Sequence, residues 1–330
     1  MRERIPNFWG GYDNYQKHYL TADFSPRKYF RWQNGENSFV LMDCPDLVSL
    51  KSFMTIGQYL REQDLSAPEI IEADTESGFL LLEDFGDETF TRVLQNTPGR
   101  EVQIYGAAVD ILVYLQERTQ DYAPDHTPFL KVYDVNFGLN KVGQFLTDYY
   151  PKIIGENATS EIESDFVNVW KAALEIGLNS KKSIFLRDYH VDNLIDLPHR
   201  KPFKNIGLLD FQDAVLAPVA GDLVSLLHDA RREVSNDLRK ILWLKYLDAH
   251  PKGDHQEIFI AGTILSAVRQ ARIIGLFTKK ANDGKNSHFL KQIPHLWNLL
   301  EKCCQITELK QVWGWFEQNM PKAKRIIPNL

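Results

Sequence analysis

Three polar residues in the middle of the chain have the types and the spacing that phosphoryl transfer requires. Asp188 is followed, after four intervening residues, by Asn193, and Asp210 ends the apolar run 206–209. A carboxylate such as Asp188 can accept the proton of an attacking hydroxyl. The amide oxygen of Asn193 and the carboxylate of Asp210 are hard ligands that can hold Mg²⁺ against the phosphates of ATP. The residues therefore predict an ATP- and Mg²⁺-dependent phosphotransferase.

The segments around these residues predict the elements that position them. Apolar runs at 184–186, 194–195 and 206–209 indicate short strands, and the polar stretch 198–205 indicates a turn. On this interpretation Asp188 and Asp210 lie at the mouth of one small hairpin and face one cleft. Asp and Asn also occupy ordinary turns, because their side chains bond the local backbone. The second Asp at a strand end argues against that simpler explanation.

The sequence that follows carries a family resemblance. Segments 186–194, 207–214, 222–223 and 226–232 together resemble the aminoglycoside phosphotransferase and choline kinase superfamily, whose members share the protein-kinase fold. The match is closest to the branch of anomeric kinases that act on N-acetylmuramate and N-acetylglucosamine in cell-wall recycling. Upstream, residues 23–31 resemble the nucleotide flap, and residues 78–87 resemble the last strand of the N-lobe and the hinge.

The resemblance implies a fold and a set of roles. The fold class is α+β, a two-lobed protein-kinase-like fold with a small antiparallel-sheet N-lobe and a larger, mainly helical C-lobe. Residues 1–85 form the nucleotide-binding N-lobe, and residues 86–330 form the C-lobe with the catalytic loop, the metal site and the acceptor site. Asp188 is the catalytic base, and Asn193 and Asp210 are the metal ligands. Asp222, at the start of an apolar helix, supports the backbone of the catalytic loop.

Basic residues near the N-terminus are the candidates for binding the phosphates of ATP. The strand in which kinases of this fold carry a phosphate-binding Lys reads 40-VLMD-43 and contains no base, and the flap lacks glycines. Arg27, Lys28 and Arg31 are the expected replacements. Because alternate residues of a strand point to opposite faces, they cannot all line one site. The resemblance also makes Glu83, at the hinge, a nucleotide-binding candidate.

Charged residues that follow the predicted strand ending at Asp210 are the candidates for binding the acceptor substrate. They are Asp213, Asp229, Arg231 and Arg232. Polycationic aminoglycosides would require a cluster of carboxylates, whereas the lactyl carboxylate of muramate favours an Arg that can grip it in a bidentate manner. The candidates carry both signs of charge, so charge alone leaves the acceptor open, and the resemblance implies a small-molecule acceptor of the N-acetylated amino sugar class. The alternatives are a kinase of another small alcohol, such as an aminoglycoside, choline or homoserine, and a non-catalytic, nucleotide-binding pseudokinase.

Two further features of the sequence admit other interpretations. His190 and Asp192 could join Asp188 in a metallohydrolase cluster, but no H-x-x-x-H or C-x-x-C motif supplies a second set of ligands. The apolar stripe of residues 166–173 is typical of helix core packing. Neither feature changes the kinase interpretation.

The composition limits the kinds of binding partner and the cellular compartment that we expect. The 330 residues are 44% hydrophobic and carry a formal net charge of -6 without a long basic block, so neither a nucleic-acid surface nor a membrane span is expected. The longest apolar run, 258–268, is about half the length that crosses a bilayer and predicts a core helix. Three cysteines form no disulfide framework, which fits a reducing, cytoplasmic location.

Apolar periodicity predicts the main elements. We expect a helix at 12–20, a hairpin that pairs 28–32 with 38–42 across Asn34-Gly35, a helix from 46, and strands at 69–71 and 79–82. The lobe boundary is expected near 83–88. Further helices are predicted at 100–118, 135–150 and 160–176, the last with a capping box formed by Ser160 and Glu163.

Overall fold

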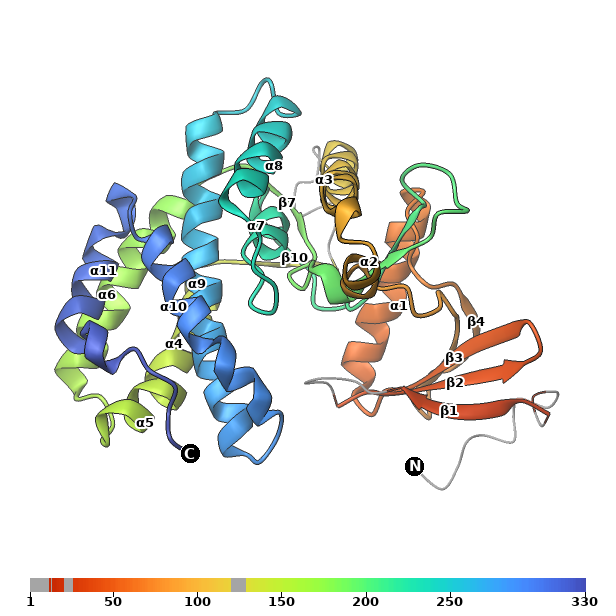
Figure 1. The fold of residues 1–330 in the computed structure, drawn as a ribbon, viewed down its shortest axis with the longest axis horizontal. Helices are drawn as coiled ribbons and strands as arrows, with labels where there is room; N and C mark the ends of the chain where they lie inside the picture. The colour runs from red at the N-terminus through yellow and green to blue at the C-terminus, as the bar shows by residue number, and fades with distance from the viewer. Residues whose placement is uncertain (1–11, 13, 21–25, 120–128) are drawn as a thin grey trace. The chain divides into compact units, whose positions relative to one another are not determined.

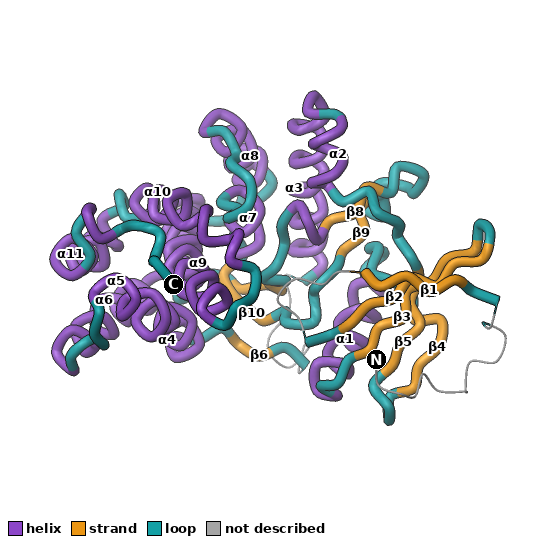
Figure 2. Tube along the Cα trace, turned by 60° about the horizontal axis from the view of Figure 1, so that its bottom comes forward, coloured by secondary structure: helices purple, strands orange, loops and turns teal. Residues whose placement is uncertain are grey.

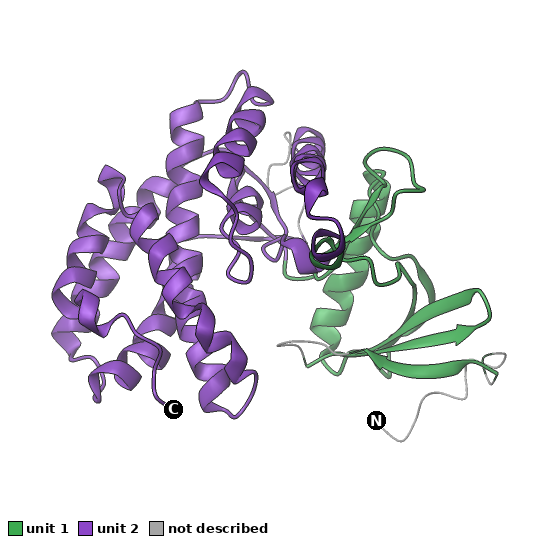
Figure 3. Cartoon of the chain, viewed as in Figure 1, with its two compact units in different colours: residues 1–92, 194–213 green, residues 93–193, 214–330 purple. Residues whose placement is uncertain are grey.

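A computed structural model describes residues 12, 14–20, 26–119 and 129–330. Two compact units make up the chain, and each consists of two segments (Figure 3). Unit 1 contains residues 1–92 and 194–213, and unit 2 contains residues 93–193 and 214–330. This division differs from the sequence-based boundary at residue 85 in where it places 86–92 and 194–213. Residues 23–25 of the expected flap lie outside the described residues.

Unit 1 is built on a five-stranded antiparallel sheet with the order β1-β2-β3-β5-β4 (Figures 1 and 2). Its strands are β1 (Gln16–Leu20), β2 (Lys28–Asn34), β3 (Asn37–Asp43), β4 (Ile70–Asp74) and β5 (Phe79–Glu83). The predicted hairpin is confirmed as β2 and β3. Asn34 pairs with Asn37, so the turn is one residue later than expected, and Gly35 supplies the positive φ of 59° that a two-residue loop needs.

The helix predicted at 12–20 is wrong, because residues 16–20 form the edge strand β1. Lys17 pairs with Trp32, and its ammonium lies 4.5 Å from the centre of the Trp32 ring. The polar residues of this segment therefore lie at a solvated sheet edge. There, the alternation of side chains along a strand determines the structure, and the helical periodicity of the sequence does not.

Helix α1 (Leu47–Glu62) and an aromatic cluster complete the core of unit 1. Asp46 caps the helix by accepting a hydrogen bond from the Val48 N–H at 3.0 Å. On one face of the sheet, Trp32, Leu41, Phe79 and Leu81 form a buried cluster. By the pairing register, Arg31 points to the opposite face from Trp32.

The second segment of unit 1 is a short hairpin, β8 (Leu194–Asp196) with β9 (Ile206–Leu208), as predicted. It joins the first segment through a bridge between Ser66 and Gly207 and through a hydrogen bond from the Leu208 N–H to the Ser66 carbonyl at 2.8 Å. The run at 184–186 does not belong to this hairpin, because it ends a strand of unit 2. Along the chain, the loop with Asp188 precedes β8 and Asp210 follows β9, so the two residues flank the open end of the predicted hairpin.

Unit 2 is mainly helical (Figure 1). The short helix α2 (Phe90–Asn96) leads into it. The other helices are α3 (Glu101–Arg118), α4 (Val135–Gln144), α5 (Tyr150–Ile154), α6 (Ser160–Gly177), α7 (Gly221–Leu227), α8 (Asn236–Asp248), α9 (His255–Asn282), α10 (Ile293–Cys303) and α11 (Lys310–Asn319). The α6 cap is Thr159 rather than Ser160: its hydroxyl accepts from the Ile162 N–H at 3.3 Å.

Helix α9 is the centre of unit 2. By length and composition alone, this helix could cross a membrane. However, 78% of its apolar 18-residue stretch is buried inside the structure, which is the environment of a core helix. A Cβ on Gly275 would lie 2.2 Å from the Gln144 carbonyl oxygen, so only glycine lets α9 approach the end of α4 this closely.

A three-stranded sheet in unit 2 leads into the segment that contains Asp188 (Figures 1 and 2). Its order is β6-β10-β7, with β6 (Lys131–Val132), β7 (Lys182–Phe185) and β10 (Val215–Pro218). Strand β7 pairs antiparallel with β10 and then opens into the loop 186–193, called the catalytic loop below.

Candidate active site

Asp222 of α7 holds the beginning of the catalytic loop. Its two carboxylate oxygens accept hydrogen bonds from the backbone N–H groups of Leu186 at 2.7 Å and Arg187 at 2.9 Å. The Tyr189 hydroxyl donates to the Ala108 carbonyl of α3 at 2.9 Å and fixes the middle of the loop. Only 1% of Asp222 is exposed. Its role in the structure is thus to fix the backbone on which Asp188 is carried, as the sequence predicted.

Burial raises the pKa of Asp222 to about 7, although the two backbone donors favour the carboxylate. An acid whose pKa is higher in the folded than in the unfolded chain binds its proton more tightly when folded. Its contribution to stability is therefore complete below about pH 4 and is lost as the pH rises to about 7, by about 1.4 kcal/mol per pH unit.

This linkage gives a testable difference between the wild type and Asp222→Asn, which does not titrate at this position. We expect the melting temperature of the wild type, minus that of the variant, to fall steadily between pH 5 and pH 7 and then to level. Thermal unfolding monitored by circular dichroism at half-unit steps measures this difference. A constant difference over that range would mean that Asp222 stays ionised.

Asn193 ends the catalytic loop and turns back onto Asp188. Its amide nitrogen donates to the Asp188 carbonyl at 2.9 Å and lies 3.3 Å from His190 Nε2. Both contacts use the nitrogen, so the amide oxygen is the atom that remains for a cation. Burial raises the pKa of Asp188, but Arg272 and other cations nearby outweigh burial and hold that pKa below its usual value. Asp188 is therefore ionised at neutral pH.

Arg187 adopts a backbone conformation that non-glycine residues avoid. Its φ is +74°, and such a conformation costs on the order of 1–3 kcal/mol. Asp222 and the Ser225 hydroxyl, which donates to the Arg187 carbonyl at 3.3 Å, hold the backbone in place. The guanidinium carbon lies 5.6 Å from the centre of the Phe137 ring. The strained residue thus carries a long cationic side chain toward α4.

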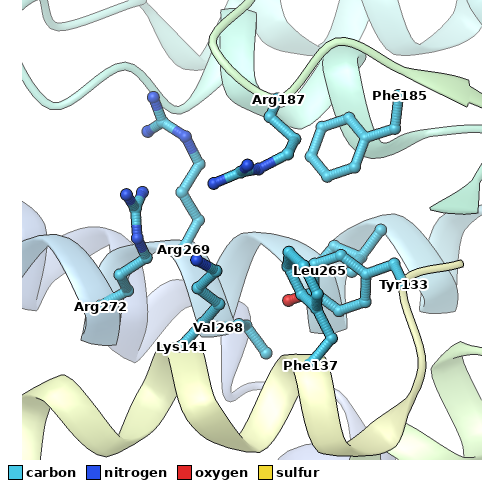
Figure 4. Close-up of a pocket in the computed structure, with 9 residues that line it drawn as sticks. All are labelled: Tyr133, Phe137, Lys141, Phe185, Arg187, Leu265, Val268, Arg269 and Arg272. Atoms are coloured by element: carbon cyan, nitrogen blue, oxygen red, sulfur yellow. The ribbon is translucent and has the colours of Figure 1, made fainter. Parts of the chain in front are cut away.

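Arg187 is one of four cations that line a small hollow within unit 2 (Figure 4). Figure 4 shows Arg269 and Arg272 on α9 and Lys141 on α4 at its other sides. The remaining described residues that line it are apolar or aromatic: Tyr133, Phe137, Phe185, Leu265 and Val268. No acidic residue is among these described lining residues. The hollow is therefore strongly cationic and lies beside the segment that carries Asp188.

Asp210 lies in unit 1 and forms an ion pair with Arg27. The Arg27 Nη2 to Asp210 Oδ1 distance is 2.7 Å, and the Gln212 amide donates to the same oxygen at 3.0 Å. Phe211 anchors the segment by stacking on Phe53 of α1 with ring centres 4.9 Å apart. The Arg27 cation expected to bind phosphate therefore lies next to the carboxylate expected to bind Mg²⁺.

Each of the two predicted metal ligands has an oxygen of the kind that Mg²⁺ binds. Mg²⁺ is usually held by one or two protein oxygens together with phosphate oxygens and water. In unit 1, Asp210 has a carboxylate that is 39% exposed, and in unit 2, Asn193 has an amide oxygen. Across residues 12, 14–20, 26–119 and 129–330 there is no cluster of three His, Cys, Asp or Glu side chains that could hold a metal. A metallohydrolase cluster around His190 and Asp192 thus finds no support in this part of the chain.

The other predicted nucleotide-binding residues differ in their partners and in their exposure. Arg31 binds both oxygens of Asp84, at 2.6 and 3.0 Å, and one of Asp87 at 2.8 Å. Lys28 is exposed and begins β2 on the face opposite to Arg31. Glu83 forms an ion pair with Arg200. Arg27 is therefore the cation of this group that accompanies Asp210.

Asp229, Arg231 and Arg232 lie in unit 2 among acidic and aromatic partners. Arg232 donates to Glu101 at 2.6 Å. Arg231 lies 3.3 Å from an Asp192 oxygen and 4.0 Å from Asp229 Oδ1. Asp229 is completely buried, and burial raises its pKa. Both arginines thus already have carboxylate partners, which weakens them as sites for a substrate carboxylate.

Asp213 lies in unit 1, where it is exposed and contributes to the raised pKa of Arg27. Sequence reasoning missed the four cations of the hollow. Arg269 and Arg272 are three residues apart in an otherwise apolar helix, so they lie on one face, and this spacing was the signal available. Arg187 was visible only as the neighbour of Asp188, because its positive φ cannot be read from the sequence.

Comparison with known proteins agrees with this arrangement. The sequence profile of the phosphotransferase enzyme family matches residues 19–258. A curated N-acetylmuramate/N-acetylglucosamine kinase from Caulobacter vibrioides is 29% identical, over 96% of this chain and 95% of that protein. A protein of the same name from Pseudomonas aeruginosa is 28% identical, over 85% of this chain and 81% of that protein.

Solved structures with low sequence identity share the fold. A choline kinase from Streptococcus pneumoniae matches with a TM-score of 0.60 at 10% identity, over 87% of this chain and 93% of that chain. An ADP-bound aminoglycoside phosphotransferase matches with a TM-score of 0.57 at 13% identity, over 86% and 92%. The predicted kinase-like fold is confirmed.

Proposed function

This chain belongs to the phosphotransferase enzyme family, and from that premise we propose that it transfers the γ-phosphoryl group of ATP to the anomeric hydroxyl of N-acetylmuramate and N-acetylglucosamine. The observation that carries the proposal is the catalytic loop: Asp222 fixes its backbone, and its Asp188 is kept ionised beside a cationic hollow. The names of the relatives support this choice of acceptor.

Each residue of the site has a separate role in the proposed reaction. Asp188 accepts the proton of the anomeric hydroxyl as that oxygen bonds to the γ-phosphorus and the bond to the β-phosphate oxygen breaks, which releases ADP. An anomeric hydroxyl is more acidic than an ordinary alcohol, so a carboxylate with a low pKa suffices as the base. Asn193 and Asp210 would hold Mg²⁺, which neutralises phosphate charge when bound. Arg27 is the residue that we assign to the phosphates in place of the missing strand Lys.

A panel of acceptors tests the proposal. Purified protein with Mg-ATP receives N-acetylmuramate, N-acetylglucosamine, glucose, kanamycin, choline or homoserine, and ADP release is measured. We expect the two N-acetylated sugars to be the best substrates and to give an acid-labile, alkali-stable product, as a sugar 1-phosphate does. The Asp188→Asn protein serves as the control for contaminating kinases.

Preference for kanamycin, choline or homoserine over both sugars would refute the acceptor assignment and leave the phosphotransferase chemistry intact. A product that survives mild acid would instead place the phosphate on another hydroxyl.

A further inference from the structure

The cationic hollow has a size and a lining that suit a small anion on an apolar arm. Its volume is about 40 Å³, and a cavity needs about 10–15 Å³ to hold a single water. A volume that holds a few water-sized groups suits a carboxylate with a neighbouring methyl group. Tyr133, Phe137 and Phe185 supply an apolar wall for the methyl group.

We propose that this hollow, lined by Lys141, Arg187, Arg269 and Arg272, binds the lactyl carboxylate of N-acetylmuramate, an inference that rests on the proposed sugar-kinase function. The site lies within unit 2, beside the loop that carries Asp188, so an acceptor anchored there by its carboxylate is held near the base. Guanidinium groups are suited to this role because they bind carboxylates in a bidentate manner.

The charges around the hollow favour an anion there. Burial lowers the pKa of Arg269, and the neighbouring Arg231 and Arg272 lower it further, against the carboxylates of Asp229 and Asp188. The hydrogen bond of Arg269 to the His228 carbonyl is long, at 3.4 Å. A negatively charged group between α9 and Arg187 would offset the repulsion among these cations.

The strained backbone of Arg187 points in the same direction. Glycine would adopt its φ of +74° without strain, so an Arg at this position requires a benefit from the side chain. From this position the Arg187 side chain extends toward Phe137, in the wall of the hollow.

Specificity constants for two sugars test the inference. N-Acetylmuramate and N-acetylglucosamine differ only in the lactyl group, so the ratio of their kcat/KM values reports on its recognition. We expect Arg272→Gln, Arg269→Gln and Arg187→Gly each to lower this ratio at least about tenfold, mainly through KM for N-acetylmuramate. Lys279→Gln, which removes an exposed cation from the same helix, should leave the ratio unchanged. Arg187→Gly relieves the strain and should fold.

A modified acceptor tests the same contact without altering the protein. With the wild type, kcat/KM should fall by the same factor when the carboxylate of N-acetylmuramate is converted to a carboxamide. Arg272→Gln should lower kcat/KM for this carboxamide little further. Inorganic phosphate is the second anion to be tried: selective competition against N-acetylmuramate supports the site, whereas equal competition against both sugars counts against it.

The outcomes separate this inference from the proposed function. If neither sugar is phosphorylated, the proposed function fails first. If both sugars are phosphorylated but the Arg variants lower both kcat/KM values by one common factor, the hollow acts on Asp188 or on the nucleotide, and the carboxylate site is overturned while the kinase assignment stands.

Discussion

Asp188→Asn lowers kcat for the best acceptor sugar by about 100-fold or more and leaves the fold intact. The carboxylate of Asp188 is the proposed acceptor of the hydroxyl proton, and loss of a general base costs typically 10²–10⁴-fold. The loop should keep its shape, because its backbone is held by Asp222 and Tyr189 rather than by the Asp188 side chain. Steady-state ADP release at saturating Mg-ATP measures the loss, and the melting temperature verifies the fold.

Asp165→Asn is the matched control, since it makes the same chemical change at an exposed position of α6 in the same unit. It should leave kcat within about twofold. Wild-type turnover by a folded Asp188→Asn protein would show that Asp188 is not the base. A loss confined to KM would assign Asp188 to acceptor binding instead.

The catalytic loop could be predicted from the sequence because its information is local. Asp188 and Asn193 are five residues apart, and the contact of the Asn193 amide with the Asp188 carbonyl closes that short span. Such short-range patterns depend on residue type and spacing more than on the tertiary context. The role of Asp222, by contrast, was implied by the family resemblance: its position at the start of an apolar helix indicated an N-cap, whereas the N-cap of α7 is Ala220.

Charge partners distant in sequence could not be predicted. Arg27 and Asp210 are 183 positions apart, and Arg232 and Glu101 are 131 apart, so no spacing rule relates them. The cationic hollow combines residues from α4, the catalytic loop and α9, and it exists only once α9 has packed in the core of unit 2. The error at residues 12–20 has a related cause, because an edge strand depends on its neighbour for hydrogen bonds.

The three arginines of the hollow also bear on the chemistry of Asp188. Arg272, Arg187 and Arg269 all lower its pKa, and together they outweigh burial. An acidic acceptor that neutralises part of this charge would raise the proton affinity of Asp188 as it binds. The base would thus become stronger when the sugar that needs it is present.

Asp210→Ala abolishes Mg²⁺-dependent turnover, with a loss of at least about 10³-fold that added Mg²⁺ does not restore. The change removes the carboxylate proposed as a metal ligand and also the 2.7 Å partner of Arg27, which is 7% exposed. A charge-assisted hydrogen bond of this kind contributes about 1.5–3 kcal/mol, so we also expect a lower stability. Turnover over a range of Mg²⁺ concentrations, together with calorimetry of Mg-ATP binding, measures the first effect, and urea unfolding measures the second.

Asp210→Asn separates the two roles of this side chain. Its amide oxygen can still accept from Arg27, so the fold should lose less stability than in Asp210→Ala, while the neutral ligand should still leave turnover severely reduced. Asp64→Asn is the control in unit 1, because it removes an exposed carboxylate paired with Lys201 and Lys204 and should change neither property much. If Asp210→Asn kept full Mg²⁺-dependent activity, Asp210 would be the partner of Arg27 alone, and the metal would have to be held by other oxygens.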